Sequence, residues 1–304
     1  MRSPRLQSVW IILVALGGIG ALPHFSYAQG TGGPIVTDSK AGYIDNAIPG
    51  DLFRMRYDSS YDNIRPTRAE YFYAKGSPAG PGLPLPEPRV DYQDISVYGE
   101  VLLFPRFSTF LDLPIRFLNP EVNANAAGLA DLNTGFKWAF LESENEILSF
   151  QLRTYIPTGN ATRGLGTNHV SLEPALLYYQ ALNESVGIEG EFRYWVPIGG
   201  TDFAGQIIRY GVGGYWTAIK KERWSLSPVV EFVGWTVLGG KENIVQPPAP
   251  MEVVDAAGDT IINSKLGMRM GLGDRADFYA GWGRALTSNT WYSNTLRLEL
   301  RLLY

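Results

Sequence analysis

The sequence contains one arrangement of residue types that could support hydrolysis. His169, Ser171 and Glu173 occupy alternate positions, so an extended strand would place their side chains on one face. A histidine can activate a serine hydroxyl when the two groups lie within hydrogen-bonding distance. Residues two apart on a strand need not reach one another, however, and the chain has no Gly-x-Ser-x-Gly nucleophile elbow. A hydrolase is therefore the third of our hypotheses, and we expect the protein not to be an enzyme.

Metal-binding and cofactor chemistry have little basis in this composition. The chain has no cysteine and, after residue 28, a single histidine, which excludes the usual zinc and copper sites. Asp255 and Asp259 could serve only as weak calcium ligands. No phosphate-binding or nucleotide-binding motif occurs, and the formal net charge of −4 argues against nucleic acid as a partner. We therefore expect no cofactor and no metal.

Charged residues recur at alternate positions along most of the chain, and their two signs nearly balance. The set comprises Asp94, Glu100, Asp112, Asp131, Glu173, Glu189, Glu191, Glu231, Glu299, Arg116, Lys137, Arg153, Arg193, Arg209, Lys265, Arg269, Arg297 and Arg301. Inside a barrel these charges must pair with one another or reach water. They could form a structural ion-pair network or a polar constriction. Their balance argues against a strongly ion-selective pore, which needs a ring of one sign.

Aromatic residues share the parity of these charges. They are Tyr98, Tyr155, Tyr179, Trp195, Tyr215, Trp235 and Tyr279. They could line a path for aromatic solutes, or they could simply fill the interior of a narrow barrel. The residues that we expect along a solute path are Tyr155, Trp195, Tyr98, Tyr215, Arg153, Arg193, Glu191, Asp131 and Lys137.

These positions require strands with two different faces. From residue 50 to residue 304 the chain is a succession of alternating segments of about ten residues. In the last segment every second residue is apolar or aromatic. These residues are Leu296, Leu298, Leu300, Leu302 and Tyr304. The alternation is typical of a transmembrane antiparallel β-barrel, but a water-soluble β-sandwich would also alternate.

The connections between segments favour the barrel. Short polar turns alternate with long loops that are rich in glycine and proline. The short turns are 105–106, 141–145, 182–185, 220–223 and 273–275, and the long loops are 76–90, 118–128, 158–168, 197–205, 238–259 and 286–292. Outer-membrane barrels have short periplasmic turns and long outer loops. Aromatic residues such as Trp138 and Trp216 near the turns, and Phe117 and Trp282 near the loops, predict the two interfacial girdles.

Counting the turns predicts an all-β fold of about twelve strands. The strands are expected near 66–75, 91–104, 107–117, 129–140, 147–157, 168–179, 186–196, 206–218, 224–237, 260–272, 276–285 and 293–304. Residues 51–57 also alternate and break the even count that barrels of this class prefer. They could extend the first strand, plug the lumen, or belong to a barrel of fourteen strands.

The first 28 residues have the features of a secretory signal peptide. Arg2 and Arg5 precede an apolar run over 9–22, and Ala28 closes a small-residue cleavage site. The run is shorter than the roughly 20 residues of a membrane-spanning helix. We expect a periplasmic leader over 29–49 and the barrel over 50–304. The final aromatic residue, Tyr304, predicts a signal for the outer-membrane assembly machinery and thus an outer-membrane location.

Several stretches resemble the outer-membrane proteins of the meta-pathway phenol degradation family. They are residues 128–138, 155–159, 164–166, 172–176 and the glycine-rich stretch 206–218. Residues 128–138 look like the Gly-Leu-Gly-Asp-Leu strand of that family, except that Ala130 replaces a common glycine. The resemblance implies a barrel that imports hydrophobic or aromatic compounds.

We therefore expect an outer-membrane channel for small hydrophobic or aromatic solutes, with the lipid bilayer, the assembly machinery and the solute as its partners. A structural or adhesive barrel with a closed lumen is the alternative. The third hypothesis is the hydrolase, placed at the outer rim.

Overall fold

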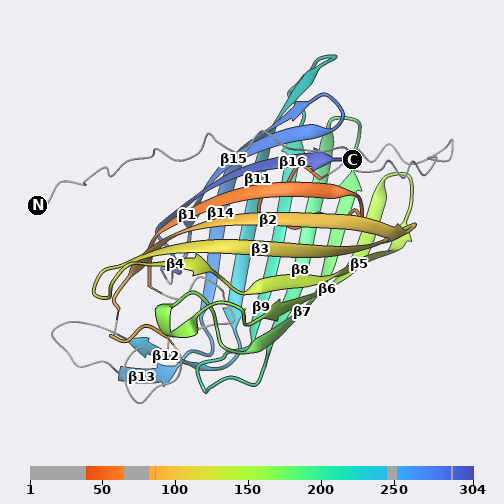
Figure 1. Ribbon diagram of the computed structural model, residues 1–304. Helices are drawn as coiled ribbons and strands as arrows, with labels where there is room; N and C mark the ends of the chain where they lie inside the picture. The colour runs from red at the N-terminus through yellow and green to blue at the C-terminus, as the bar shows by residue number, and fades with distance from the viewer. Residues whose placement is uncertain (1–38, 65–81, 86, 245–251, 289) are drawn as a thin grey trace, which may run out of the picture. The chain divides into compact units, whose positions relative to one another are not determined.

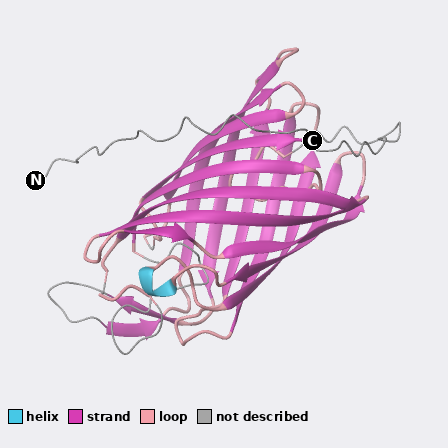
Figure 2. Ribbon diagram, viewed as in Figure 1, coloured by secondary structure: helices cyan, strands magenta, loops and turns pink. Residues whose placement is uncertain are grey.

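The computed structural model describes residues 39–64, 82–85, 87–244, 252–288 and 290–304. The predicted signal peptide lies outside the described residues. Within them, almost all regular structure is β-strand, with one short 3-10 helix, η1 (Ala161–Arg163) (Figure 2). A search of the same residues finds no helix that is both long and apolar enough to cross a membrane.

Twelve antiparallel strands form a closed barrel (Figure 1). They are β1 (Leu52–Asn63), β2 (Val90–Phe104), β3 (Phe107–Pro120), β5 (Leu132–Glu142), β6 (Glu146–Ile156), β7 (Val170–Ala181), β8 (Val186–Ile198), β9 (Ile207–Trp216), β11 (Trp224–Val237), β14 (Thr260–Leu272), β15 (Ala276–Ala285) and β16 (Asn294–Leu303). The ring closes because β1 pairs with both β2 and β16, while β11 pairs with both β9 and β14.

Short additional strands extend the connections. They are β4 (Ala126–Leu129), which pairs with β3, β10 (Ile219–Lys220), which pairs with β11, and a hairpin of β12 (Lys241–Ile244) and β13 (Glu252–Asp255). We call the end of the barrel that carries the short connections near residues 105, 144, 183, 222 and 274 the turn end, and the opposite end the loop end.

The predicted strand count is confirmed, and the predicted strands from 91–104 onward agree with the observed bounds to within three residues. The prediction is wrong about which segment is the first strand. The predicted strand near 66–75 lies outside the described residues, and the first strand of the ring is instead β1, which contains residues 51–57 almost entirely. The pairing explains this, because Phe53 and Met55 lie opposite Leu302 and Leu300 of β16.

The two faces of the wall have opposite polarity. Outward residues at the middle of the strands are apolar and exposed, such as Phe192, Val212 and Leu266. Inward residues include Lys137 and Arg193, which are at most 2% exposed. A soluble protein would bury the apolar face, whereas this exterior requires lipid. The twelve strands therefore span a membrane.

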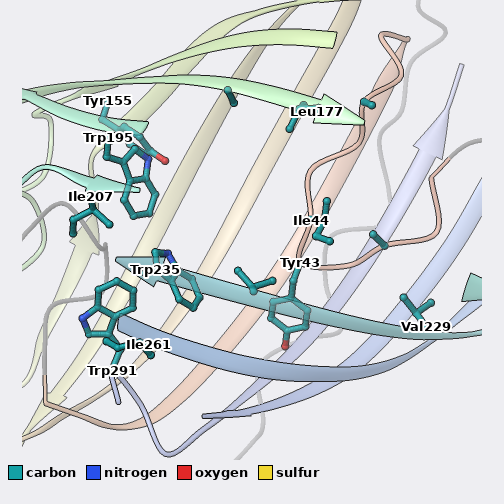
Figure 3. Close-up of a cluster of buried hydrophobic side chains, with 14 of the residues drawn as sticks. Tyr43, Ile44, Tyr155, Leu177, Trp195, Ile207, Val229, Trp235, Ile261 and Trp291 are labelled. Carbon is teal, nitrogen blue, oxygen red and sulfur yellow. The ribbon is translucent and has the colours of Figure 1, made fainter. Parts of the chain in front are cut away.

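Residues 39–50, which we call the lumen segment, precede β1 and lie inside the barrel. Figure 3 shows Tyr43 and Ile44 projecting from this segment into the space that the strands enclose. Ala41 and Ala47 are likewise buried. The sequence predicted a periplasmic leader over 29–49, but the structure places 39–49 inside the barrel. There, charged side chains of the wall serve as the hydrogen-bond partners that water would otherwise provide. Residues 29–38 lie outside the described residues.

The polarity of the wall generates a first prediction. Leu266 lies at the centre of β14 on the outward face, so an arginine there should cost about 2–4 kcal/mol of barrel stability. Leu286, which follows β15 at the loop end and is also exposed, provides the matched control. We expect Leu266→Arg to reduce the yield of folded barrel in heat-modifiable gel mobility, and Leu286→Arg to change it little. Equal yields would contradict the assignment of the lipid face.

Candidate functional site

Two glutamates of the wall hold the backbone amides of the lumen segment. Glu189 of β8 accepts hydrogen bonds from the Ser39 hydroxyl and from the amides of residues 40 and 41, at 2.9 and 3.0 Å. Glu231 of β11 accepts bonds from the amides of residues 42, 43 and 44, at 3.1, 2.8 and 2.8 Å. Since the segment forms no strand, these carboxylates satisfy donors that would otherwise be buried without a partner.

Four arginines of the wall bind the carbonyls of the same segment. Arg269 donates to the carbonyls of residues 40 and 41, at 2.8 and 2.6 Å, and Arg301 donates to that of residue 39 at 2.7 Å. Arg297 and Arg209 bind the carbonyls of residues 42 and 43, each at 2.6 Å. The amides of the segment thus donate to carboxylates, and its carbonyls accept from guanidinium groups. Hydrogen bonds with a charged partner are stronger than those between neutral groups.

Asp45 fixes the middle of the lumen segment. Its carboxylate lies 2.6 Å from a guanidinium nitrogen of Arg153 and 2.8 Å from one of Arg193. Arg193 also pairs with Glu173 and Glu191. Burial alone would raise the pKa of the Asp45 carboxyl, but Arg193 and Arg153 outweigh it and hold this pKa well below its ordinary value. Asp45 therefore stays ionised inside the barrel.

The lumen segment fills the half of the barrel near the turn end. Glu189 lies near the start of β8, beside the turn at 182–185. On the opposite side of the lumen, Lys137 pairs with Glu100 at 3.0 Å and donates to the carbonyl of Ile48. Ser149 donates to the carbonyl of Ala47. The segment is thus bound to strands around the whole ring.

A cavity of about 230 Å³ lies between the lumen segment and the loop end. Tyr43 and Asp45 of the lumen segment contribute to its lining. Its other aromatic side chains come from the wall and from the loop before β16, and are Tyr92, Tyr155, Trp195, Trp235, Trp291 and Tyr292. Its charged side chains are Asp45, Asp58, Asp94, Asp112, Asp131, Glu173, Arg56, Arg116, Arg153, Arg193, Arg209, Lys265 and Arg297. Both signs are present, so the lining forms no ring of one charge.

The structure divides the residues predicted along a solute path into two groups. Tyr155, Trp195, Arg153, Arg193 and Asp131 line the cavity. The remaining four are buried in contacts with one another, with the wall or with the lumen segment. They are Tyr98, Tyr215, Glu191 and Lys137.

Individual contacts show what the second group does. Tyr98 donates to Glu100 at 2.5 Å and stacks on Phe110. The hydroxyl of Tyr215 lies 2.6 Å from that of Tyr179. Glu191 pairs with Arg209 at 2.8 Å. These residues stabilise the interior of the barrel around the lumen segment.

Asp131 lines the cavity and also fastens a loop. Its carboxylate accepts hydrogen bonds from the amides of Gly159 and Thr167, at 3.0 and 2.9 Å, so it fixes both ends of the connection from β6 to β7. The sequence placed Asp131 on the inward face but gave no sign of this bond. Asp131 therefore fixes the β6–β7 connection where it borders the cavity at the loop end.

Sequence analysis missed several residues of this site, including Tyr92, Arg56 and Asp58 of the wall and two pairs that lie outside the wall strands. Tyr43 and Asp45 lay in the predicted leader, and Trp291 and Tyr292 in a predicted outer loop. The ring of Trp291 packs edge-on against Trp235, with centroids 4.8 Å apart. Two adjacent aromatic residues in a loop are a signal of burial that could have identified this inward fold.

The residues of the hydrolase hypothesis have separate partners. The Nδ1 atom of His169 lies 3.0 Å from the carbonyl of Thr167. Glu173 accepts a hydrogen bond from Tyr155 at 3.0 Å and pairs with Arg193. The buried hydroxyl of Ser171 has no hydrogen-bond partner among the described residues. The same residues contain no cluster of three or more histidine, cysteine, aspartate or glutamate side chains that could hold a metal ion.

No protein-family model and no curated protein matches the sequence. The structure is similar to that of an outer-membrane channel from Pseudomonas putida F1, with a TM-score of 0.57 and 14% sequence identity over 88% of this chain and 100% of that chain. It is also similar to the β domain of the Bordetella autotransporter BrkA, with a TM-score of 0.50 and 10% identity over 84% of this chain and 100% of that chain. These similarities concern the fold. Together with the apolar exterior, they place this barrel in the outer membrane.

A second prediction follows from the position of Asp45. Replacing it with asparagine leaves Arg153 and Arg193 without one carboxylate, at a cost of roughly 3–5 kcal/mol to the bound state of the lumen segment. We expect Asp45→Asn to increase the rate at which a thiol reagent modifies Ala47→Cys, the only cysteine then present. Asp202→Asn, which removes an exposed loop carboxylate, is the control. Equal rates in the two variants would show that Asp45 does not hold the segment.

Proposed function

We propose that the protein is an outer-membrane channel for small solutes with a hydrophobic or aromatic body. The observation that carries this proposal is the aromatic-lined cavity between the loop end and the lumen segment. In this proposal the loop end faces the outside of the cell and the turn end faces the periplasm, as in other barrels with short periplasmic turns. A solute would enter among the loops and reach the cavity first.

The size of the cavity limits the solute. An enclosed apolar cavity of about 150 Å³ binds benzene. By volume, the cavity of about 230 Å³ can hold a molecule with one ring and a substituent, and its charged side chains suit a substituent that is polar. Trp195 and Tyr155, whose centroids lie 6.4 Å apart with their rings nearly perpendicular, offer edges and faces for such a ring.

Passage to the periplasm requires the lumen segment to move. Its described contacts join its backbone and the side chains of Ser39, Tyr43 and Asp45 to side chains of the wall, whereas the wall strands bond to one another. Displacing the segment therefore leaves the ladder of the barrel intact. The segment would act as the gate of the channel.

The resemblance of residues 128–138 and 155–159 to the meta-pathway phenol degradation family supports an aromatic cargo. We propose membership of that family on these motifs, with Ala130 as the departure noted above. We also propose that Tyr304, exposed directly after β16, marks the chain for the outer-membrane assembly machinery.

A structural or adhesive barrel with a permanently closed lumen is the second candidate. The observation that favours it is the extent of charged contact around the lumen segment, from Glu189 and Glu231 to Arg269 and Arg301. The two candidates differ in whether any solute crosses the barrel.

A third prediction separates these candidates. We expect the full-length protein to admit a small phenolic compound into proteoliposomes, because the segment can leave its site without opening the wall. Removing residues 40–48 should raise the conductance in planar bilayers several-fold, because the half of the lumen near the turn end is then unfilled. A shortened variant that conducts no more than the full-length protein would contradict the gate. A full-length protein that excludes every small solute would favour the closed barrel.

A fourth prediction concerns the aromatic lining. Replacing both Tyr155 and Trp195 with alanine should lower the preference for phenol over a non-aromatic alcohol of similar size, measured as relative rates of proteoliposome swelling. The cost to stability is several kcal/mol, because two large interior side chains are lost. Tyr179→Ala, which empties a buried position outside the cavity lining, is the control for this loss. An unchanged preference with fewer folded barrels would show that the two rings only fill space.

A further inference from the structure

One wall of the cavity carries hydrogen-bond donors that no described protein group satisfies. The indole nitrogens of Trp195, Trp235 and Trp291 are buried and have no hydrogen-bond partner among the described residues. All three side chains line the cavity, and the residues are at most 9% exposed. Buried donors are nearly always paired, so three unpaired donors around one space indicate a missing acceptor.

Lys265 adds an amino group to this wall. The residue is 2% exposed, and its Nζ atom lies 4.1 Å from the ring centroid of Tyr43 and donates a hydrogen bond to the hydroxyl of Tyr292. Within the part of the chain that the structure describes, it forms no ion pair with a carboxylate. The neighbouring Arg297, by contrast, pairs with Asp58 through two bonds of 2.6 and 2.8 Å. Lys265 is thus a buried amino group with no carboxylate partner, and an anionic ligand beside it would favour its charged form.

One further group extends the same set. Arg209 of β9 uses one terminal nitrogen for Glu191 and the lumen segment, while its buried Nε atom has no hydrogen-bond partner among the described residues. We call these five cavity-lining residues the donor wall: Trp195, Arg209, Trp235, Lys265 and Trp291.

The donor wall is also aromatic. Trp235 and Trp291 meet edge to face, and Arg209 lies 5.7 Å from the ring centroid of Trp235. In Figure 3, Trp195, Trp235 and Trp291 gather at one end of the buried cluster, with Tyr43 of the lumen segment toward the other. Ring faces beside unpaired donors and a lysine without a carboxylate partner match a ligand with an aromatic body and an anionic group.

We propose that the donor wall binds an aromatic carboxylate with a single ring. The carboxylate accepts hydrogen bonds from Lys265 and from the indole nitrogens, and the ring packs against Trp235 and Trp291. A neutral molecule of the same shape leaves the ammonium and these donors without an anionic acceptor, so the site discriminates against it. This inference deepens the proposed function, on which it rests for the route of the ligand, but the site can fill without transport.

Equilibrium binding to the purified full-length barrel tests the proposal, with benzoate and its neutral isostere benzamide as probes in calorimetry. We expect benzoate to bind roughly 10- to 100-fold more tightly than benzamide, the range for one charge-assisted hydrogen bond. Lys265→Gln should weaken benzoate binding far more than benzamide binding and so abolish this ratio. Lys241→Gln, which removes an exposed lysine of the β12–β13 hairpin, should leave the ratio intact.

Lys265→Arg is the control for loss of folding, because it keeps a basic side chain at this position. It should give a barrel of normal gel mobility that retains most of the preference for benzoate. Equal binding of the two probes to the unmodified protein, or an unchanged ratio in folded Lys265→Gln, would overturn the proposal.

The proposed channel can fail independently of this binding site. Benzoate binding by a protein that admits no solute into proteoliposomes would keep the site and contradict the channel. Solute uptake without any preference for benzoate in binding would keep the channel and contradict the site.

Discussion

The interior of this barrel is organised around a piece of backbone that has no strand to pair with. The lumen segment would carry unpaired amides and carbonyls into a space with little water, where each unpaired group is costly. Glu189 and Glu231 meet the amides, while Arg269 and Arg301 are among the four arginines that meet the carbonyls. The near balance of charge on the inner wall therefore has a structural cause. The acidic side chains provide acceptors for the amides of the segment, and the basic side chains provide donors for its carbonyls. The part of the lumen that the segment does not fill is the cavity.

The strands could be predicted because their signal is local. Alternation with a period of two places each side chain on one face, whatever the rest of the chain does. The lumen segment could not be predicted this way, since it has no periodicity and its partners are remote. Ser39 and Arg301 are bonded although 262 residues separate them. The first strand was misplaced for a related reason. The short alternation of 51–57 leaves open whether these residues extend a strand near 66–75, plug the lumen or add to the wall, and only the pairing of β1 with β16 identifies the first strand.

The site was predicted in part, and the limit is again physical. Parity shows that a side chain points inward but not at which depth along the barrel. Trp195 and Tyr98 share that property, yet Trp195 lines the cavity and Tyr98 packs near the turn end against Glu100 and Phe110. The donor wall was equally hidden, because an unpaired indole or lysine is defined by the absence of a neighbour in space.

The pairing of β1 with β16 also determines the order in which the protein can assemble. Arg297 and Arg301 lie near the end of the chain and bind the carbonyls of residues 42 and 39, and Asp277 pairs with Arg301. The first described residues therefore have no complete binding surface until the last strands exist. Contacts of such long sequence separation form slowly, because the chain loses the entropy of closing a large loop before the contacts contribute any stabilising free energy. Closing the wall and filling the lumen thus become a single late event, and a nascent chain that lacks its final strand would hold an open interior and an unbound N-terminal segment.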